Sequence, residues 1–530
     1  MGTATNLEVE IKFSATEELA VPDLTHVSGC AAARETVVHR LSAVYFDTPD
    51  LRLTRAKVTL RRRTGGKDDG WHIKLPGEQG RLEIHADSDP ADPERIPAEI
   101  LATVRALSRG QSLEPIARVD NERHETVYED AAGEALAEFC DDHVSARSFL
   151  PTGTARRWRE WEIELAGPAA ETKRGAKFLR KASKVVRAAG ASDSDSPSKL
   201  VAALGESIAA APTPPQLAEL PSSSPAAGVV AALAQNRDRI VEMDPRVRRD
   251  EWDSIHQMRV ATRELRSHMR TFEGILVGEA YGHIEQELKA LAGILGQARD
   301  AEVVAERMAH LIEAEDSGMI DETTRTRVLQ GLHRDYRRAH ARVVKVLDSE
   351  RYLTLLRDLD ELLAHPPLAD DAHEAGDTAA AAEPEQVLAS HLDDAYRRLV
   401  KRHKKAVALW ADQELDLHTR ENAVHNMRKA AKKLRYSADA AGAATSLKTK
   451  KVVKACKRMQ SVLGDFQDTV TSRDMIVRLA LRARAKGEDT FAYGLLYQKE
   501  RQLGLQALSG YEESFDAIRA AYTKMRGRRR

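Results

Sequence analysis

The sequence predicts a multidomain α+β protein, in which an N-terminal antiparallel β-barrel is followed by an all-α, duplicated helical bundle. Three observations carry this prediction. Charged and apolar side chains alternate through much of the segment from Glu8 to Leu165, with the period of two that is typical of strands. Beyond Pro225, alanine, leucine and arginine dominate and indicate helices. A histidine-containing motif occurs twice in this second part, which indicates duplication.

Length and composition exclude several classes of protein. A chain of 530 residues is too long for one hydrophobic core, so two or three domains are expected. Three widely spaced cysteines, Cys30, Cys140 and Cys456, predict a reducing compartment without a disulfide framework. No apolar run approaches the roughly 18 residues of a membrane span, and the N-terminus carries acids where a signal peptide would be apolar. We therefore expect a cytoplasmic protein that does not associate with membranes.

The opening strand places three charges on one face. Glu8, Glu10 and Lys12 alternate with the apolar residues Val9 and Ile11. Carboxylates two positions apart in a strand are about 7 Å apart, which suits a divalent ion bound through oxygen. The lysine is a point charge suited to phosphate. From this segment alone, an edge strand with solvated charges remains an alternative.

Later segments repeat the pattern with the charges sorted by sign. The middle strands carry cations on one face, at Arg61, Arg63, His72, Lys74 and Arg81. The last strand carries carboxylates on one face, at Glu160, Glu162 and Glu164. Closing the sheet into a barrel would place both sets in one cavity, where buried like charges need a counter-charge. A polyphosphate on the basic set, with a divalent metal between it and the acids, would supply that counter-charge.

This part of the chain resembles the CYTH superfamily, the triphosphate tunnel metalloenzymes, over about residues 1–205. The ordered motifs that carry the resemblance are ExExK at Glu8, Glu10 and Lys12, LRxR at Leu60, Arg61 and Arg63, the strand lysine Lys74, RxE at Arg81 and Glu83, ExExE at Glu160, Glu162 and Glu164, and Ser198-Lys199-Leu200. Arg123, Glu138 and Asp142 fit less closely, because the strand register leaves both Asp141 and Asp142 open.

The resemblance implies roles for these residues and a cofactor, Mg²⁺ or Mn²⁺. It implies catalytic roles for Glu8, Glu10, Lys12 and Glu162. It implies substrate binding by Arg61, Arg63, Lys74, Arg81, Arg123 and Lys199. It implies metal binding by Glu8, Glu10, Glu138, Glu160, Glu162 and Glu164.

A Pro/Ser-rich linker, residues 206–225, is expected to separate the barrel from a helical domain at 226–530. The segment Ile255–Arg259 recurs at Val424–Arg428, and Leu295–Asp300 recurs at Leu463–Asp468. Because the two matches have nearly the same offset along the chain, they predict two repeats, at about 226–365 and 386–530. The intervening stretch from Pro366 to Pro384 is expected to form a loose joint.

Each repeat carries a basic stripe beside an apolar stripe. The basic residues are spaced three and four apart, which keeps them on one helix face: His256, Arg259, Arg263, Arg266 and Arg270 in the first copy, and His425, Arg428, Lys432 and Arg435 in the second. The apolar stripe lies one residue earlier and is expected to be buried. Salt bridges to other helices are one interpretation of the cations. Because neither stripe contains an acid, we favour anion binding. Six further cations follow at Lys448, Lys450, Lys451, Lys454, Lys457 and Arg458.

The helical half resembles the CHAD family over roughly residues 226–525, through the two stripes. The resemblance implies a pseudo-twofold helical fold that binds inorganic polyphosphate. The polyphosphate-binding residues it implies are His256, Arg259, Arg263, Arg266, His425, Arg428, Lys432 and Arg435.

The expected function is metal-dependent hydrolysis of inorganic triphosphate or a related triphosphate, with polyphosphate bound by the helical domain. A non-catalytic polyphosphate-binding protein is the main alternative, and an adenylate cyclase is a further one. Nucleic acid is not an expected partner, because the basic stripes lack interleaved aromatic residues for base stacking.

Overall fold

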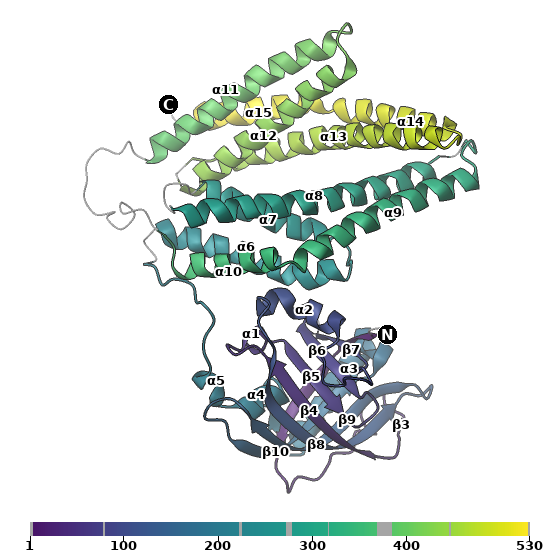
Figure 1. Cartoon of the computed structure of the whole chain (residues 1–530), viewed down its shortest axis with the longest axis vertical. Helices are drawn as coiled ribbons and strands as arrows, with labels where there is room; N and C mark the ends of the chain where they lie inside the picture. Colours follow the sequence, from purple (N-terminus) through teal and green to yellow (C-terminus); the bar gives the residue numbers. More distant parts are fainter. Residues whose placement is uncertain are drawn as a thin grey trace. The chain divides into compact units, whose positions relative to one another are not determined.

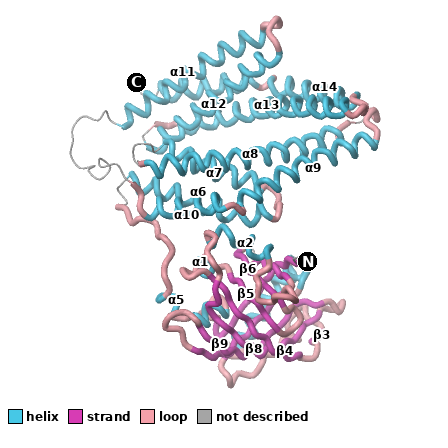
Figure 2. The backbone as a smooth tube through the Cα atoms, in the orientation of Figure 1, coloured by secondary structure: helices cyan, strands magenta, loops and turns pink. Residues whose placement is uncertain are grey.

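The computed structural model describes residues 4–77, 80–221, 225–271, 278–315, 317–367, 384–444 and 447–527. It divides into two compact units, Met1–Gly296 with Ala341–His373, and Gln297–His340 with Glu374–Arg530. The predicted fold class is confirmed: a curled antiparallel sheet in the N-terminal part is followed by a helical region (Figures 1 and 2). The predicted limits of the tunnel domain, linker and repeats stay predictions.

The sheet has eleven strands, in the order β1-β7-β6-β5-β4-β8-β9-β10-β2-β11, and β3 pairs with β8. The strand bounds are β1 Ala4–Glu8, β2 Glu10–Ala15, β3 Ala32–Ala33, β4 Val37–Asp47, β5 Thr59–Thr64, β6 Gly70–Pro76, β7 Arg81–Ala86, β8 Glu114–Glu129, β9 Ala135–Ser148, β10 Ala155–Leu165 and β11 Ser192–Asp193. Each of these strands pairs with its neighbours in the antiparallel direction.

The opening segment closes this sheet. β1 pairs with β7, and β2, which begins just after it, pairs with β10. The break falls at Val9, whose carbonyl accepts a hydrogen bond from the Leu165 amide at 2.9 Å. The two halves of one segment therefore join distant strands, with Glu8 opposite Arg81 and Glu10 opposite Glu164. The predicted acidic motif lies at this closing seam.

Two hydrophobic cores of the N-terminal part lie on the outer face of the sheet, and a third includes Ala43, Tyr45 and Val119 from β4 and β8. Helix α3 (Lys173–Ala188) buries Phe178 against Phe13 and Trp161. Helix α2 (Ala98–Ser108) buries Val104 against Trp71. Because these two helices pack on the outer face of the sheet, most of the inner face can carry charged side chains. Three short helices complete this part: α1 Arg52–Arg55, α4 Lys199–Leu204 and α5 Ser207–Ala210.

The remaining elements are helices. Their bounds are α6 Pro225–Arg248, α7 Ser254–Thr271, α8 Glu279–Glu313, α9 Glu322–Leu347, α10 Glu350–Ala364, α11 Pro384–Ala411, α12 Leu417–Ala444, α13 Lys450–Ala485, α14 Phe491–Leu508 and α15 Tyr511–Gly527. Every residue of the two predicted apolar stripes is buried: Ile255, Met258, Thr262, Leu265 and Met269 on α7, and Val424, Met427, Ala431, Leu434 and Ala438 on α12.

Three other expectations concern the chain as a whole. Cys30, Cys140 and Cys456 are free thiols. Within the described ranges, none of the helices combines the length and apolarity needed to cross a membrane. Residues 368–383 of the expected joint lie outside the described residues. A cytoplasmic location stays a prediction.

Within the first unit, Asp360 of α10 gathers three arginines from separate elements. Arg109 donates to both carboxylate oxygens, at 2.9 and 3.0 Å, and Arg52 donates at 2.9 Å. Arg237 of α6, the third arginine, donates a fourth hydrogen bond. Only 4% of Asp360 is exposed, and although burial would raise its pKa, the surrounding guanidinium groups hold it below the ordinary value. This carboxylate therefore joins α1, α2, α6 and α10.

Asp360→Ala should lower the thermal unfolding midpoint of the full chain, monitored by tryptophan fluorescence. The change leaves three clustered guanidinium groups without their acceptor, and losing one partner of a buried pair costs about 3–5 kcal/mol. Glu361→Ala is the control, because Glu361 is 69% exposed and pairs only with His365 among the described residues. Equal midpoints for the two variants would contradict a structural role for Asp360.

Candidate active site

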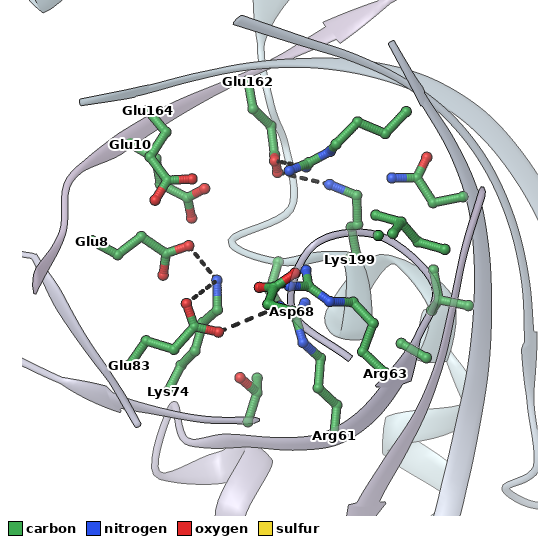
Figure 3. Close-up of a pocket in the computed structure, with 18 of the residues that line it drawn as sticks. Glu8, Glu10, Arg61, Arg63, Asp68, Lys74, Glu83, Glu162, Glu164 and Lys199 are labelled. Carbon is green, nitrogen blue, oxygen red and sulfur yellow. Dashed lines mark hydrogen bonds and ion pairs between the residues drawn. The ribbon is translucent and has the colours of Figure 1, made fainter. Parts of the chain in front are cut away.

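A cavity of about 390 Å³ runs through the inside of the curled sheet. Its walls are side chains from β1, β2, β4 to β10 and the start of α4. Figure 3 shows Glu8, Glu10 and Glu164 on one side of the cavity, with Arg61 and Arg63 on the other. The alternation of charged and apolar residues in the strands thus produces a tunnel in which acids line one side and arginines line the other.

The first acidic group consists of Glu8, Glu10 and Glu164. One carboxylate oxygen from each lies within 4.8 Å of the others. Lys74 contacts Glu8, and Lys12 lies 2.9 Å from Glu10. One buried oxygen of Glu8, Oε2, has no hydrogen-bond partner among the described residues. Three converging carboxylates with an unsatisfied oxygen fit a hard divalent cation such as Mg²⁺ or Mn²⁺.

Glu164 shows that Lys12 and Lys74 do not balance the three carboxylates of this group. Burial, followed by the negative charge of Glu8, raises the pKa of Glu164 to about 8, although Lys74 acts in the opposite direction. A carboxyl that stays protonated near neutral pH indicates that the cations nearby do not balance the acids. A divalent ion would remove this deficit.

The second acidic group consists of Asp142, Glu160 and Glu162, all buried. The Lys199 Nζ lies 2.8 Å from Asp142, 2.6 Å from Glu160 and 2.8 Å from Glu162. Arg123 contacts Asp142 at 2.7 Å and Glu162 at 2.5 Å. Burial would raise the pKa of Asp142, but Arg123 and Lys199 lower it to about 2. Protein cations therefore stabilise the ionised forms of Asp142 and Glu162, whereas burial raises the pKa of Glu160.

Arg61 and Arg63 form the basic wall on β5. Burial, followed by the charge of Arg61, lowers the pKa of Arg63 to about 9. The Nε atoms of both arginines are buried, with no hydrogen-bond acceptor among the described residues. Arg61 pairs with Glu83 at 3.4 Å, and Arg63 pairs with Asp68. Crowded cations with unsatisfied donors favour an anionic ligand.

The other residues expected to bind substrate also line the tunnel, with different neighbours. Lys74 bridges Glu8 and Glu83, the latter at 3.9 Å. Arg81 lines the cavity and donates to the Lys57 carbonyl at 3.1 Å. Arg123 and Lys199 hold the second acidic group, as described above.

Glu138 is the one expected metal ligand outside both acidic groups. It lies opposite Glu164 in the strand register and lines the cavity. Burial and the charge of Glu125 raise its pKa. The expected ligand set therefore divides: Glu8, Glu10 and Glu164 converge, Glu160 and Glu162 converge elsewhere with Asp142, and Glu138 stands apart.

The sequence left one strand register open, and it did not point to several tunnel residues, of which Tyr45 is one. Asp142 faces the tunnel, whereas Asp141 faces outward and accepts two hydrogen bonds from Arg159, each 2.8 Å long. Tyr45, which is buried and lines the cavity, lies opposite Arg61 across β4 and β5. Although burial raises the pKa of Tyr45, Arg61 lowers it below the ordinary value. The alternation of β4 places Tyr45 on one face, but only the strand pairing places it beside Arg61.

The basic stripes of the helical part lie at the borders of their buried apolar stripes. In each repeat a glycine lies beside a stripe arginine: a Cβ at Gly296 would lie 3.5 Å from Arg259 Nε, and one at Gly464 would lie 3.7 Å from Arg428 Nε, both ordinary van der Waals distances. These glycines belong to the second repeated motif. His425 contacts Gln467 at 2.8 Å. Arg263 is exposed, and Arg435 and Lys432 are half-buried.

The salt-bridge interpretation of the stripe cations applies to Arg266. Arg266 pairs with Glu285 of α8 at 2.6 Å. For Arg428 and Arg435 of the second stripe, in contrast, the buried Nε atoms have no hydrogen-bond acceptor in the described part of the chain. The stripes are thus only partly neutralised by the protein itself.

The fold and the site together define a class of protein, in which a tunnel with opposed acidic and basic walls precedes a duplicated helical domain. The CYTH domain model matches residues 6–196, and the CHAD domain model matches residues 231–477. The predicted resemblance to both is confirmed. "Uncharacterized protein Rv2226" of Mycobacterium tuberculosis is 36% identical over 99% of this chain and 98% of its own length. The chain belongs to this family of CYTH–CHAD proteins.

Two solved structures are similar to parts of the chain. PptA from Streptomyces chartreusis is 16% identical, with a TM-score of 0.41, and the match covers 56% of this chain and 100% of PptA. The CHAD domain from the plant Ricinus communis is 20% identical, with a TM-score of 0.39, and the match covers 59% of this chain and 96% of that domain.

The metal-free protein should become less stable as the pH rises, because of Glu164. Its pKa is about 8 in the folded protein against 4.5 ordinarily, so the folded state holds the proton longer. The stabilisation is fully present below the ordinary pKa and is lost as the pH rises through about 8. Glu164→Gln cannot ionise and should flatten this decline, measured as urea midpoints in EDTA at pH 6 and 9. Glu134→Gln, on the surface, should retain it. A decline as steep as wild type in Glu164→Gln would exclude Glu164 as its source.

Proposed function

We propose that the tunnel is the active site of a metal-dependent hydrolase of inorganic triphosphate or a related triphosphate. The observation that carries this proposal is that an under-neutralised acidic group and a crowded basic wall line one cavity. The acids fit a divalent cation, and the arginines fit phosphate oxygens. A triphosphate would bring negative charge to the arginines, and its metal ion would bring positive charge to the carboxylates.

In the proposed hydrolysis, residues on the two sides of the tunnel have different roles. Arg61 and Arg63 bind phosphate oxygens and stabilise charge on the transferring phosphoryl group. Glu83 and Tyr45 orient Arg61, and the Nδ1 atom of His72 lies 3.0 Å from Glu83. Mg²⁺ or Mn²⁺ held by Glu8, Glu10 and Glu164 would supply Lewis acidity and charge neutralisation.

Hydrolysis of a phosphoric anhydride needs no covalent enzyme intermediate. Water forms the new P–O bond, the bridging P–O bond breaks, and tripolyphosphate yields pyrophosphate and phosphate with release of a proton near neutral pH. The cavity lining includes no serine or cysteine paired with a histidine base in the part of the chain that the structure describes. The second acidic group would act as support, because it keeps Lys12, Arg123 and Lys199 in place.

We also propose that the helical domain binds inorganic polyphosphate along its basic stripes without hydrolysing it. The described stripe cations are exposed or half-buried, and the buried Nε atoms of Arg428 and Arg435 have no hydrogen-bond acceptor among the described residues, which suits a linear polyanion. The acid clusters suited to metal, by contrast, lie in the tunnel among the described residues. Non-catalytic binding of polyphosphate by both domains is the alternative that kinetics must test.

Glu10→Gln should reduce phosphate release from tripolyphosphate and Mg²⁺ by about 100-fold or more, the scale expected when one electrostatic group is removed from an active site. The change removes a carboxylate from the first acidic group without enlarging or shrinking the side chain. Released phosphate is measured colorimetrically, with circular dichroism as the test of folding. Glu18→Gln, on an exposed loop nearby, is the matched control and should retain wild-type activity.

Two outcomes would overturn the hydrolase proposal. One is the absence of phosphate release by wild type with Mg²⁺ or Mn²⁺ across pH 6 to 10. The other is a folded Glu10→Gln variant as active as Glu18→Gln.

Arg263→Glu combined with Lys432→Glu should abolish retention of long-chain polyphosphate in EDTA while leaving tripolyphosphate hydrolysis within about twofold of wild type. The double change reverses one cation in each stripe, and wild-type retention should fall steeply with salt as counterions are released. Arg338→Glu with Arg397→Glu is the control, because both arginines are exposed, both pair with an acid and the net charge changes equally. Loss of hydrolysis in a folded stripe variant would show that the two domains do not act separately.

A further inference from the structure

A second cationic cavity, of about 710 Å³, lies in the second unit, where the ends of α12 and α15 meet the start of α13. Four lysines line it: Lys448, Lys450, Lys451 and Lys524. Its one acidic lining residue is Asp439. Leu447, Val453 and Met525 add apolar surface. The cavity is therefore a cationic pocket with an apolar part.

The four lysines make no ion pair or side-chain hydrogen bond within the described part of the chain. Lys448, Lys450 and Lys451 are exposed, as is Lys524, so their charges are solvated rather than paired. Four like charges around one cavity repel one another, and each favours a bound anion. The lysine ammonium group binds phosphate as a point charge.

The start of α13 adds a second source of positive potential. Lys450 and Lys451 are the first two residues of this 36-residue helix, and its first turn contains no acid. Thr449 precedes them, yet its side chain does not cap the helix. Cations at a helix N-terminus oppose the helix dipole, so this arrangement is locally unfavourable in the free protein. An anion would offset both effects, because free backbone N–H groups at a helix start also bind anions.

The lysine pocket is not part of the duplicated basic stripe. With the repeats aligned so that Leu295 matches Leu463, the positions of Lys448, Lys450 and Lys451 are taken in the first repeat by Ala280, Gly282 and His283. The first repeat therefore lacks these lysines. On α12 the stripe continues one helical turn beyond Arg435 to Asp439, an acid at the edge of the pocket. The lysines thus belong to the second repeat alone and form a separate cluster.

We propose that this lysine pocket binds a compact ligand with two or three linked phosphate groups, independently of the tunnel and the basic stripes. Two sources share this chemistry. An inorganic di- or triphosphate would use the lysines and the start of α13. A nucleoside diphosphate would use them in the same way and place its base against Leu447, Val453 or Met525.

Lysine footprinting of the full-length protein tests this inference without relying on catalysis. The protein is acetylated with an N-hydroxysuccinimide ester in EDTA, and each lysine is followed by peptide mass spectrometry. The probes are pyrophosphate, tripolyphosphate and ADP at about 2 mM, twice the Kd of about 1 mM that is the weakest affinity of interest, with sulfate at matched ionic strength as the control anion. We expect acetylation of the four pocket lysines to slow by about threefold or more. Lys401 and Lys405, exposed on α11, should react at an unchanged rate.

Slower acetylation of the pocket lysines with the inorganic probes and ADP alike supports the proposal. Slower acetylation with ADP alone also supports it and identifies the ligand as a nucleotide. Protection by none of the three, or equal protection by sulfate, overturns the proposal. Lys451→Gln with Lys524→Gln should remove the protection of Lys448 and Lys450, whereas Lys401→Gln with Lys405→Gln should preserve it.

The stripe variant Arg263→Glu with Lys432→Glu distinguishes this site from the proposed polyphosphate site. Protection of the pocket lysines should persist in that variant. If it disappears while the variant remains folded, the pocket is an extension of the stripe and a separate site is excluded. Neither result depends on whether the tunnel hydrolyses triphosphate.

Discussion

Charge balance on the inner face of one curled sheet is the constraint on which this structure depends. Buried ionised side chains persist only when opposite charges meet at hydrogen-bond distance. In the second acidic group Lys199 contacts Asp142, Glu160 and Glu162, and although burial acts in the opposite direction, Lys12, Lys199 and Arg123 hold the pKa of Glu162 well below its ordinary value. In the first group Lys74 contacts Glu8 and Lys12 contacts Glu10, and burial with the charge of Glu8 still raises the pKa of Glu164 to about 8. The imbalance marks where a metal and a polyanion would complete the site.

The fold accommodates this charged interior by placing its apolar packing outside. Phe13 and Trp161 pack beneath α3, and Trp71 packs near α2, so the sheet is held by its outer face. The break at Val9 lets one segment close the sheet, which brings Glu8 and Glu10 to the seam beside Glu164. The same separation of roles appears in the helical part, where buried apolar stripes adjoin basic stripes.

Much of the fold and part of the site could be predicted from local pattern. Period-two alternation placed Arg61 and Glu162 on the inner face, and the repeated motifs predicted the duplication. Contacts that depend on strand register could not be predicted. Asp141 and Asp142 are adjacent in sequence, and only pairing shows that Arg159 holds the first outside while Arg123 meets the second inside. Likewise, a strand pattern cannot show that Tyr45 lies opposite Arg61.

The most direct test of the central claim is to locate the metal ion and the phosphate groups that the tunnel is proposed to bind. Crystals grown with Mn²⁺ and tripolyphosphate, measured at the manganese absorption edge, would place the metal by its anomalous signal. The account predicts manganese at Glu8, Glu10 and Glu164, with phosphate density against Arg61 and Arg63 and Lys199 still on the second acidic group. Manganese bound instead between Asp142, Glu160 and Glu162 with Lys199 displaced, or a tunnel without phosphate density while the helical stripes are occupied, would contradict it.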